Sequence, residues 1–101
     1  MRDRRSEPRY SVDQPVVVTI LDSGDREPFE GTVVDLSRSG LGVRVPYPID
    51  LGCRIEIRWS RGTVVGQVRN CHRIRPDNYR VGLKTSQAME LSEMEAQIGV
   101  A

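Results

Sequence analysis

The chain has few of the residue types on which metal centres, disulfide scaffolds and hydrolytic sites depend. His72 is the only histidine, which excludes a two-histidine metal site, and Cys53 and Cys71 lack the paired spacing of a zinc site. There is no Gly-x-Ser-x-Gly elbow and no Gly-Lys-Ser/Thr phosphate loop. A triad of Ser37, His72 and Asp35 can be drawn, but an Asp and a Ser two residues apart suit a turn better. We therefore expect neither enzyme activity nor a bound metal.

Long apolar runs and a strong excess of one charge are lacking as well. No run reaches the length of a membrane span, and the charged N-terminus has no apolar signal-peptide core. We therefore expect a cytoplasmic protein without membrane insertion, with both cysteines reduced and packed in or near the core. The net charge is only +1, whereas a general nucleic-acid surface needs a marked positive excess. One Phe, one Trp and three Tyr are also few for stacking single-stranded bases, so we expect no nucleic-acid partner.

What the chain does contain is a series of short strand patterns. The clearest is the alternation of Ile55, Ile57 and Trp59 with charged residues, which predicts a strand with one buried face. Imperfect alternation around Gly66 and Asn70 predicts a bulge or bend in a longer strand. Six strands with frequent turns favour an all-β fold, a closed or nearly closed antiparallel β-barrel. The predicted strands cover residues 16–21, 30–36, 41–45, 54–59, 63–74 and 79–84.

The two ends of the chain differ from this pattern. Residues 1–14 are polar, rich in arginine and contain Pro8, which predicts a mobile N-terminal arm before a barrel domain at 15–85. Residues 86–101 change to a helical period and predict one C-terminal helix that packs an apolar face on the barrel. That face carries Ala88, Leu91, Met94 or Glu95, and Ile98.

Two short segments carry the chemistry that is hardest to explain as structure alone. They read Arg5-Ser-Glu-Pro-Arg9 and Asp35-Leu-Ser-Arg-Ser-Gly40. The guanidinium forks of Arg5 and Arg9 can clasp phosphate, or the O6/N7 edge of guanine, through two hydrogen bonds each. The carboxylate of Asp35 can accept hydrogen bonds from the N1–H and the amine of the same base. Together the two segments favour an anionic ligand that carries a purine.

Each segment also has a structural interpretation. Arginines clustered at a terminus commonly form a solvated tail. Asp-x-Ser-x-x-Gly is a good turn sequence, in which Asp and Ser cap backbone amides and Gly takes the left-handed conformation. Tyr10 and Trp59 can stack on a base, but packing in the core or at its rim explains them as well. The two segments favour ligand binding only because they occur together, in this order, on a strand-rich chain.

In order and spacing, the two segments resemble the motifs of the PilZ domain family, bacterial receptors for the second messenger cyclic di-GMP. Weaker similarities follow at Gly52, at Gly66-Gln-Val-Arg69 and at Tyr79-Arg-Val-Gly82-Leu83. The resemblance implies a six-stranded barrel. It also implies that Arg5 and Arg9 bind phosphate and guanine groups, that Asp35 and Ser37 hydrogen-bond the guanine edge, and that Gly40 lets the backbone approach closely.

The resemblance extends to residues beside the motifs and to the mode of signalling. In the family an arginine at the place of Arg4 is associated with uptake of a stacked pair of ligand molecules. Arg38 either reaches phosphate or is solvated, and for Arg69 a solvent-facing strand position is favoured over a ligand contact. We expect no cofactor beyond this ligand, an arm that orders over it, and a relay to an effector protein. The alternative is a PilZ-like protein-interaction module without nucleotide binding.

Overall fold

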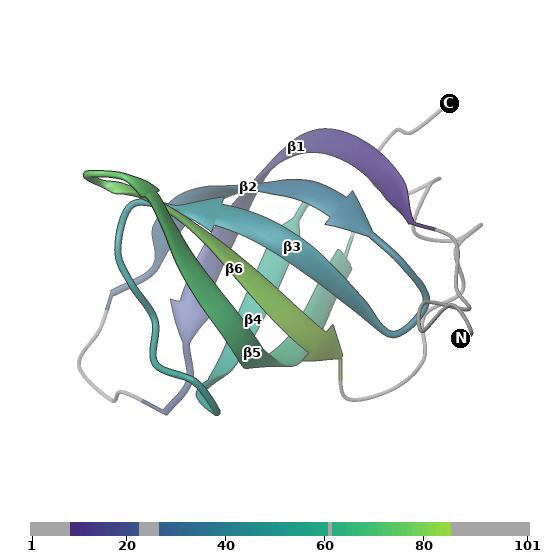
Figure 1. The fold of residues 1–101 in the computed structure, drawn as a ribbon. Helices are drawn as coiled ribbons and strands as arrows, with labels where there is room; N and C mark the ends of the chain where they lie inside the picture. The colour runs from purple at the N-terminus through teal and green to yellow at the C-terminus, as the bar shows by residue number, and fades with distance from the viewer. Residues whose placement is uncertain (1–8, 23–26, 61, 86–101) are drawn as a thin grey trace, which may run out of the picture.

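The computed structural model describes residues 9–22, 27–60 and 62–85, which form a closed antiparallel barrel (Figure 1). Around the barrel the strand order is β1-β2-β3-β6-β5-β4, and β4 closes the ring by pairing with β1. This confirms the predicted six-stranded antiparallel barrel. The strands are β1 Tyr10–Ile20, β2 Phe29–Leu36, β3 Gly40–Val45, β4 Arg54–Trp59, β5 Gly62–Arg75 and β6 Asn78–Thr85.

The core consists of the inward-facing residues of the strands together with Ile49 from the connection between β3 and β4, and most of these residues are β-branched. In β4 the predicted alternation is confirmed, since Ile55, Ile57 and Trp59 are buried and Arg58 is exposed. Trp59 therefore belongs to the core and is not available as a stacking platform for a base. β-Branched side chains fit a half-buried pleated surface well, which explains why these runs form strands. The buried set is Val16, Val18, Ile20, Val33, Leu36, Leu41, Val43, Val45, Ile49, Ile55, Ile57, Trp59, Val68, Val81 and Leu83.

The first strand begins earlier than predicted. β1 starts at Tyr10 instead of residue 16, so residues 10–14, which were expected in the mobile arm, form its first part. Tyr10 and Val12 pack against the core from this part of the strand. Pro15 is tolerated because β1 pairs with β4 only from Val17 onward, and a proline is acceptable where one edge of a strand has no ladder.

The predicted irregularity of β5 is a register shift between Val68 and Asn70. Gly66 itself stays in register with both neighbouring strands. The first part of β5, up to Gln67, pairs with β4, and the part from Gly66 onward pairs with β6. Beyond Gln67, β5 is therefore paired with another strand on one side only. The β5–β6 hairpin therefore extends past the other strands, as Figure 1 shows at the upper left.

A contact between Asp22 and Arg54 joins two strands of the barrel. The Asp22 carboxylate accepts hydrogen bonds from the backbone N–H of Arg54, at 2.8 Å, and from its guanidinium. These bonds lower the pKa of Asp22 below its ordinary value of 3.8 and join the end of β1 to the start of β4. Cys53 and Cys71 are free thiols that pack against the core, as predicted.

The ends of the chain lie outside the described residues. This applies to Arg4, Arg5 and most of the predicted arm, and to the predicted C-terminal helix at 86–101. Within the part that is described, no helix is long and apolar enough to cross a membrane.

Candidate functional site

Asp35 is the centre of a charge cluster that joins three distant parts of the chain. It lies near the end of β2 on the face opposite to the buried Leu36, and its side chain is 12% exposed. Arg9 donates a hydrogen bond from Nη2 to Oδ1 of Asp35, at 3.2 Å. Arg80 of β6 donates from Nη2 to Oδ2. A carboxylate with so little access to water needs such partners, so both cations hold the Asp35 side chain in one orientation.

The second motif continues from Asp35 into the turn between β2 and β3. The backbone N–H of Ser37 donates to the carbonyl oxygen of Gly40, at 2.8 Å, and the Ser37 hydroxyl donates to the same oxygen at 3.3 Å. The end of β6 fixes this turn, because Thr85 donates from its N–H and its hydroxyl to the carbonyl oxygen of Ser39. Ser37 therefore closes the turn, but its hydroxyl donates to a carbonyl oxygen instead of capping a backbone amide as the structural interpretation expects.

Gly40 has a role different from the left-handed turn position. Its φ is not positive, in contrast to that of Gly52, where φ is 87°. A Cβ at Gly40 would lie 2.2 Å from the carbonyl oxygen of Leu83 on β6. Glycine is therefore required here because the backbones of β3 and β6 approach each other closely.

Asp35 is also the first member of a row of residues that crosses four strands. It pairs with Gly42 of β3, which pairs with Gly82 of β6, which pairs with Asn70 of β5. A Cβ at Gly42 would lie 3.0 Å and 3.2 Å from the two carboxylate oxygens of Asp35, and 3.3 Å from Nη2 of Arg80. A Cβ at Gly82 would lie 2.7 Å from Oδ1 of Asn70. The two glycines thus form a flat floor, and the carboxylate and the amide lie over it.

A groove of about 480 Å³ opens over this floor. Four of its lining side chains are cationic, and none of the lining residues is acidic. With Asp35 beside it, the groove combines positive charge for an anion with one carboxylate that accepts hydrogen bonds. The lining consists of Arg9, Ser37, Ser39, Gly40, Leu41, Gly42, Arg69, Asn70, Arg80, Gly82, Leu83 and Lys84.

The structure brings most of the predicted site residues together. Arg9, Ser37 and Gly40 line the groove, and Asp35 contacts Arg9. Arg69 is exposed on its strand, as favoured, and also lines the groove.

The remaining predicted residues are not brought into the site. Arg38 is exposed in the turn and is not part of the lining. Arg4 and Arg5 lie outside the described residues.

Sequence reasoning missed Arg80, Gly42 and Asn70. Arg80 and Gly82 are part of the run Tyr79-Arg-Val-Gly82-Leu83, whose weak family similarity was the one available signal. Alternation alone places Arg80 on the outside of a strand, where arginine is common. Only the pairing of β3 with β6 brings it to Asp35.

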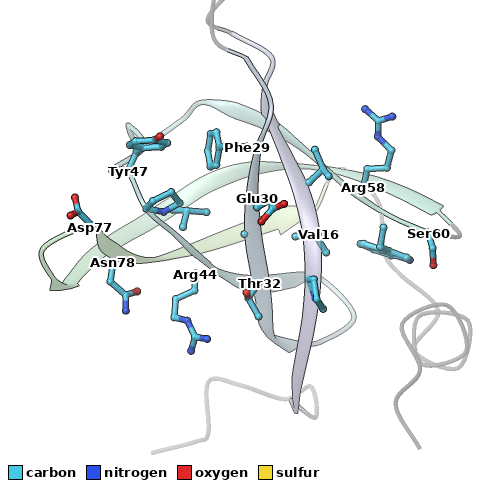
Figure 2. A pocket seen from close by; sticks show the side chains of 16 residues that line it. Val16, Phe29, Glu30, Thr32, Arg44, Tyr47, Arg58, Ser60, Asp77 and Asn78 are labelled. Atoms are coloured by element: carbon cyan, nitrogen blue, oxygen red, sulfur yellow. The ribbon is translucent and has the colours of Figure 1, made fainter.

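A larger hollow, of about 990 Å³, lies elsewhere on the barrel (Figure 2). Figure 2 shows Phe29 and Tyr47 on one side of it and Arg58 and Ser60 on the other, and the two rings meet edge to face with centroids 5.2 Å apart. Its charged residues are of both signs, and it contains no residue of either motif. Those charged residues are Glu30, Arg44, Arg58 and Asp77. We therefore place the candidate site in the smaller, cationic groove.

Comparisons with known proteins agree with this architecture. The model of the PilZ domain family matches residues 3–98. No curated protein matches the chain.

Among solved structures, the PilZ domain of YcgR from Escherichia coli with c-di-GMP has a TM-score of 0.66 and 18% identity, over 97% of this chain and 89% of that one. K. pneumonia MrkH in complex with c-di-GMP has a TM-score of 0.64 and 13% identity, over 98% of this chain and 51% of that one. The Bacillus subtilis inhibitor of motility, MotI/DgrA, has a TM-score of 0.63 and 16% identity, over 97% and 49%. The chain thus spans about half the length of MotI and MrkH, and the likeness establishes the fold.

Proposed function

Because this chain belongs to the PilZ domain family, we propose that it is a receptor for cyclic di-GMP and that the ligand binds in the groove over Gly42 and Gly82. The observation that carries this proposal is the position of Asp35, held between Arg9 and Arg80 at the edge of a cationic groove. The cationic forks suit phosphate and the O6/N7 edge of guanine, and the carboxylate suits the N1–H and the amine of guanine. The c-di-GMP in the solved YcgR and MrkH structures supports the same ligand class.

Arg9 and Arg80 supply the cationic forks. Both side chains are partly exposed, at 46% and 44%, so each can turn from Asp35 toward a phosphate or a guanine O6/N7 edge. The N1–H and the amine of guanine then replace them as hydrogen-bond partners of the Asp35 carboxylate. Arg5 completes the first motif, and Arg4 provides a contact for a second, stacked ligand molecule. Charge-assisted hydrogen bonds each contribute roughly 1.5–3 kcal/mol, so a few of them offset the ordering of several residues at about 1–2 kcal/mol each.

Asp35 supplies the selectivity for the base. Its carboxylate accepts from the N1–H and the 2-amino group of guanine, which adenine does not offer in this arrangement. Ser37 and Gly40 keep the turn and the β3–β6 pairing in place beside it. The protein then acts as an adaptor, which presents the occupied groove to an effector protein in the cytoplasm.

Calorimetry of the full chain with cyclic di-GMP tests the proposal, with cyclic di-AMP and GTP as controls. We expect selective binding of cyclic di-GMP, and a loss of about 10- to 100-fold in Arg9→Ala and in Arg80→Ala, since each removes a charged hydrogen bond. Arg5→Ala should lose binding as well. Arg58→Ala is the matched control, because this exposed arginine of β4 does not line the groove.

The stoichiometry of the same titration tests the role of Arg4, since a stacked pair requires two ligand molecules per chain. A folded wild-type chain that does not bind cyclic di-GMP would overturn the receptor function and leave the protein-interaction module. Unchanged affinity in Arg9→Ala and Arg80→Ala would overturn the assignment of the groove.

A further inference from the structure

The bulge in β5 gives Asn70 an orientation that a regular strand would not. Val68 is buried, and in a regular strand the residue two positions later faces the same side. The register shift between Val68 and Asn70 breaks this alternation. Asn70 is consequently exposed on the outer face, while the next residue, Cys71, pairs with the buried Val81 and packs against the core. Bulges beside functional sites commonly re-aim one side chain in this way.

Gly82 provides the space into which the Asn70 side chain turns. A Cβ at Gly82 would lie 2.7 Å from Oδ1, 2.8 Å from Nδ2 and 3.0 Å from Cγ of Asn70. Real Cβ contacts are essentially never this short, so any other residue at Gly82 would displace the amide. Within the described part of the chain, the amide has no hydrogen-bond partner. A bulge and a glycine thus place a polar side chain over the floor whose amide makes no hydrogen bond within the described residues.

The amide and the Asp35 carboxylate lie over neighbouring residues of the floor. Gly42, under the carboxylate, pairs directly with Gly82, under the amide, on the adjacent strands β3 and β6 (Figure 1). Paired residues of antiparallel strands have Cα atoms about 4.5–5.5 Å apart. The two polar groups are therefore about one strand spacing from each other, and the Arg80 guanidinium lies beside the carboxylate over Gly42.

From this juxtaposition we propose, building on the proposed function, that Asn70 is a second base-reading residue for the same guanine that Asp35 reads. Along one side guanine presents N1–H, the 2-amino group and the acceptor N3. The carboxylate accepts from N1–H and from one amino hydrogen. The Asn70 amide accepts the other amino hydrogen at Oδ1 and donates from Nδ2 to N3, because an amide presents an acceptor and donors side by side.

The test compares cyclic di-GMP with cyclic di-inosine monophosphate, which differs only in lacking the 2-amino groups. Calorimetry of the wild-type chain should show a clear preference for cyclic di-GMP. In Asn70→Ala we expect cyclic di-GMP to bind about tenfold more weakly, because it loses the contacts to the 2-amino group and to N3. Cyclic di-inosine monophosphate, which has N3 but no 2-amino group, should lose less affinity, so that the preference shrinks. His72→Ala is the control, since His72 is exposed on the same strand but does not line the groove.

A second variant tests whether the amide must lie over Gly82 to read the base. Gly82→Ala keeps Asn70 but displaces its side chain, and should reduce the preference for cyclic di-GMP in the same direction. If Asn70→Ala binds both nucleotides with the wild-type ratio, the base-reading role is wrong while the receptor function stands. If the folded wild-type chain binds neither nucleotide, the receptor function fails and this role fails with it.

Discussion

Gly40 lines the groove and also lies where β3 and β6 approach each other closely. One substitution there tests whether glycine is required for strand pairing or for ligand binding. In Gly40→Ala the added Cβ would lie 2.2 Å from the carbonyl oxygen of Leu83, whereas ordinary contacts begin at 3.4 Å. The backbones of β3 and β6 must therefore move apart by about 1 Å at this point. Leu41 and Leu83, the adjacent pair, are 4% and 5% exposed, so the surrounding core offers little room for the shift.

The expected loss of stability follows from two contributions. Overpacking of a tight contact costs typically 1–3 kcal/mol. One or two backbone hydrogen bonds of the β3–β6 ladder would also weaken, at about 0.5–1.5 kcal/mol each. We therefore expect Gly40→Ala to lower the free energy of unfolding by about 2–4 kcal/mol. For a domain of this size that corresponds to a fall in the melting temperature of at least about 10 °C.

Urea unfolding followed by circular dichroism measures this loss, with Gly52→Ala as the matched control. Gly52 has a φ of 87° and nothing within 4 Å of its Cβ position, so alanine there costs only the left-handed backbone, about 1–2 kcal/mol. Gly40→Ala should be the less stable of the two. Wild-type stability in Gly40→Ala, accompanied by weaker binding of cyclic di-GMP, would refute the pairing role and assign Gly40 to ligand approach.

Three other changes test the site and the frame. Asp35→Ala should reduce the calorimetric preference for cyclic di-GMP over cyclic di-AMP by about tenfold or more, and an equal loss for both nucleotides would contradict base reading. Gly42→Ala brings a Cβ to 3.0 Å from the Asp35 carboxylate, so we expect several-fold weaker binding of cyclic di-GMP at nearly unchanged stability, measured by calorimetry and thermal melting. Arg54→Ala should raise the pKa of Asp22 part of the way toward 3.8 in an NMR titration of its carboxyl group, because the guanidinium bonds are lost while the backbone N–H bond, the largest cause of the lowering, remains. Because the pKa of Asp22 is lowered in the folded protein, its contribution to stability is present above pH 3.8 and is lost as the pH falls through the pKa of the folded state. The free energy of unfolding of Arg54→Ala should therefore fall less on acidification than that of the wild type.

Local patterns were sufficient to predict most strands. β4 has the predicted bounds, Arg54–Trp59, because its alternation of isoleucine and charged residues is unbroken. The start of β1 was missed because Asp13, Gln14 and Pro15 interrupt the apolar pattern. These residues are tolerated where β1 pairs with β2 alone, and that condition depends on the barrel rather than on the segment.

The site was predictable only where its residues belong to a motif. Arg9 and Asp35 are marked by the spacing of the two motifs, and the structure brings them into contact. Arg80 and Gly42 are ordinary strand residues in the sequence, and they become site residues through the β3–β6 register. The irregularity near Asn70 was predicted. Which face of the sheet carries the Asn70 side chain, however, depends on the register between β5 and β6, and the sequence pattern does not give that register.

The two ion pairs of Asp35 also determine at which stage of folding the groove can form. They connect positions 26 and 45 residues apart, and the second partner is in the last strand of the barrel. Contacts of such sequence separation form late, because the loops between them must close first. A nascent or truncated chain without β6 therefore has no groove. On the proposed function, cyclic di-GMP would stabilise only completed barrels, and through mass action it would lengthen their survival against proteases that degrade the unfolded chain.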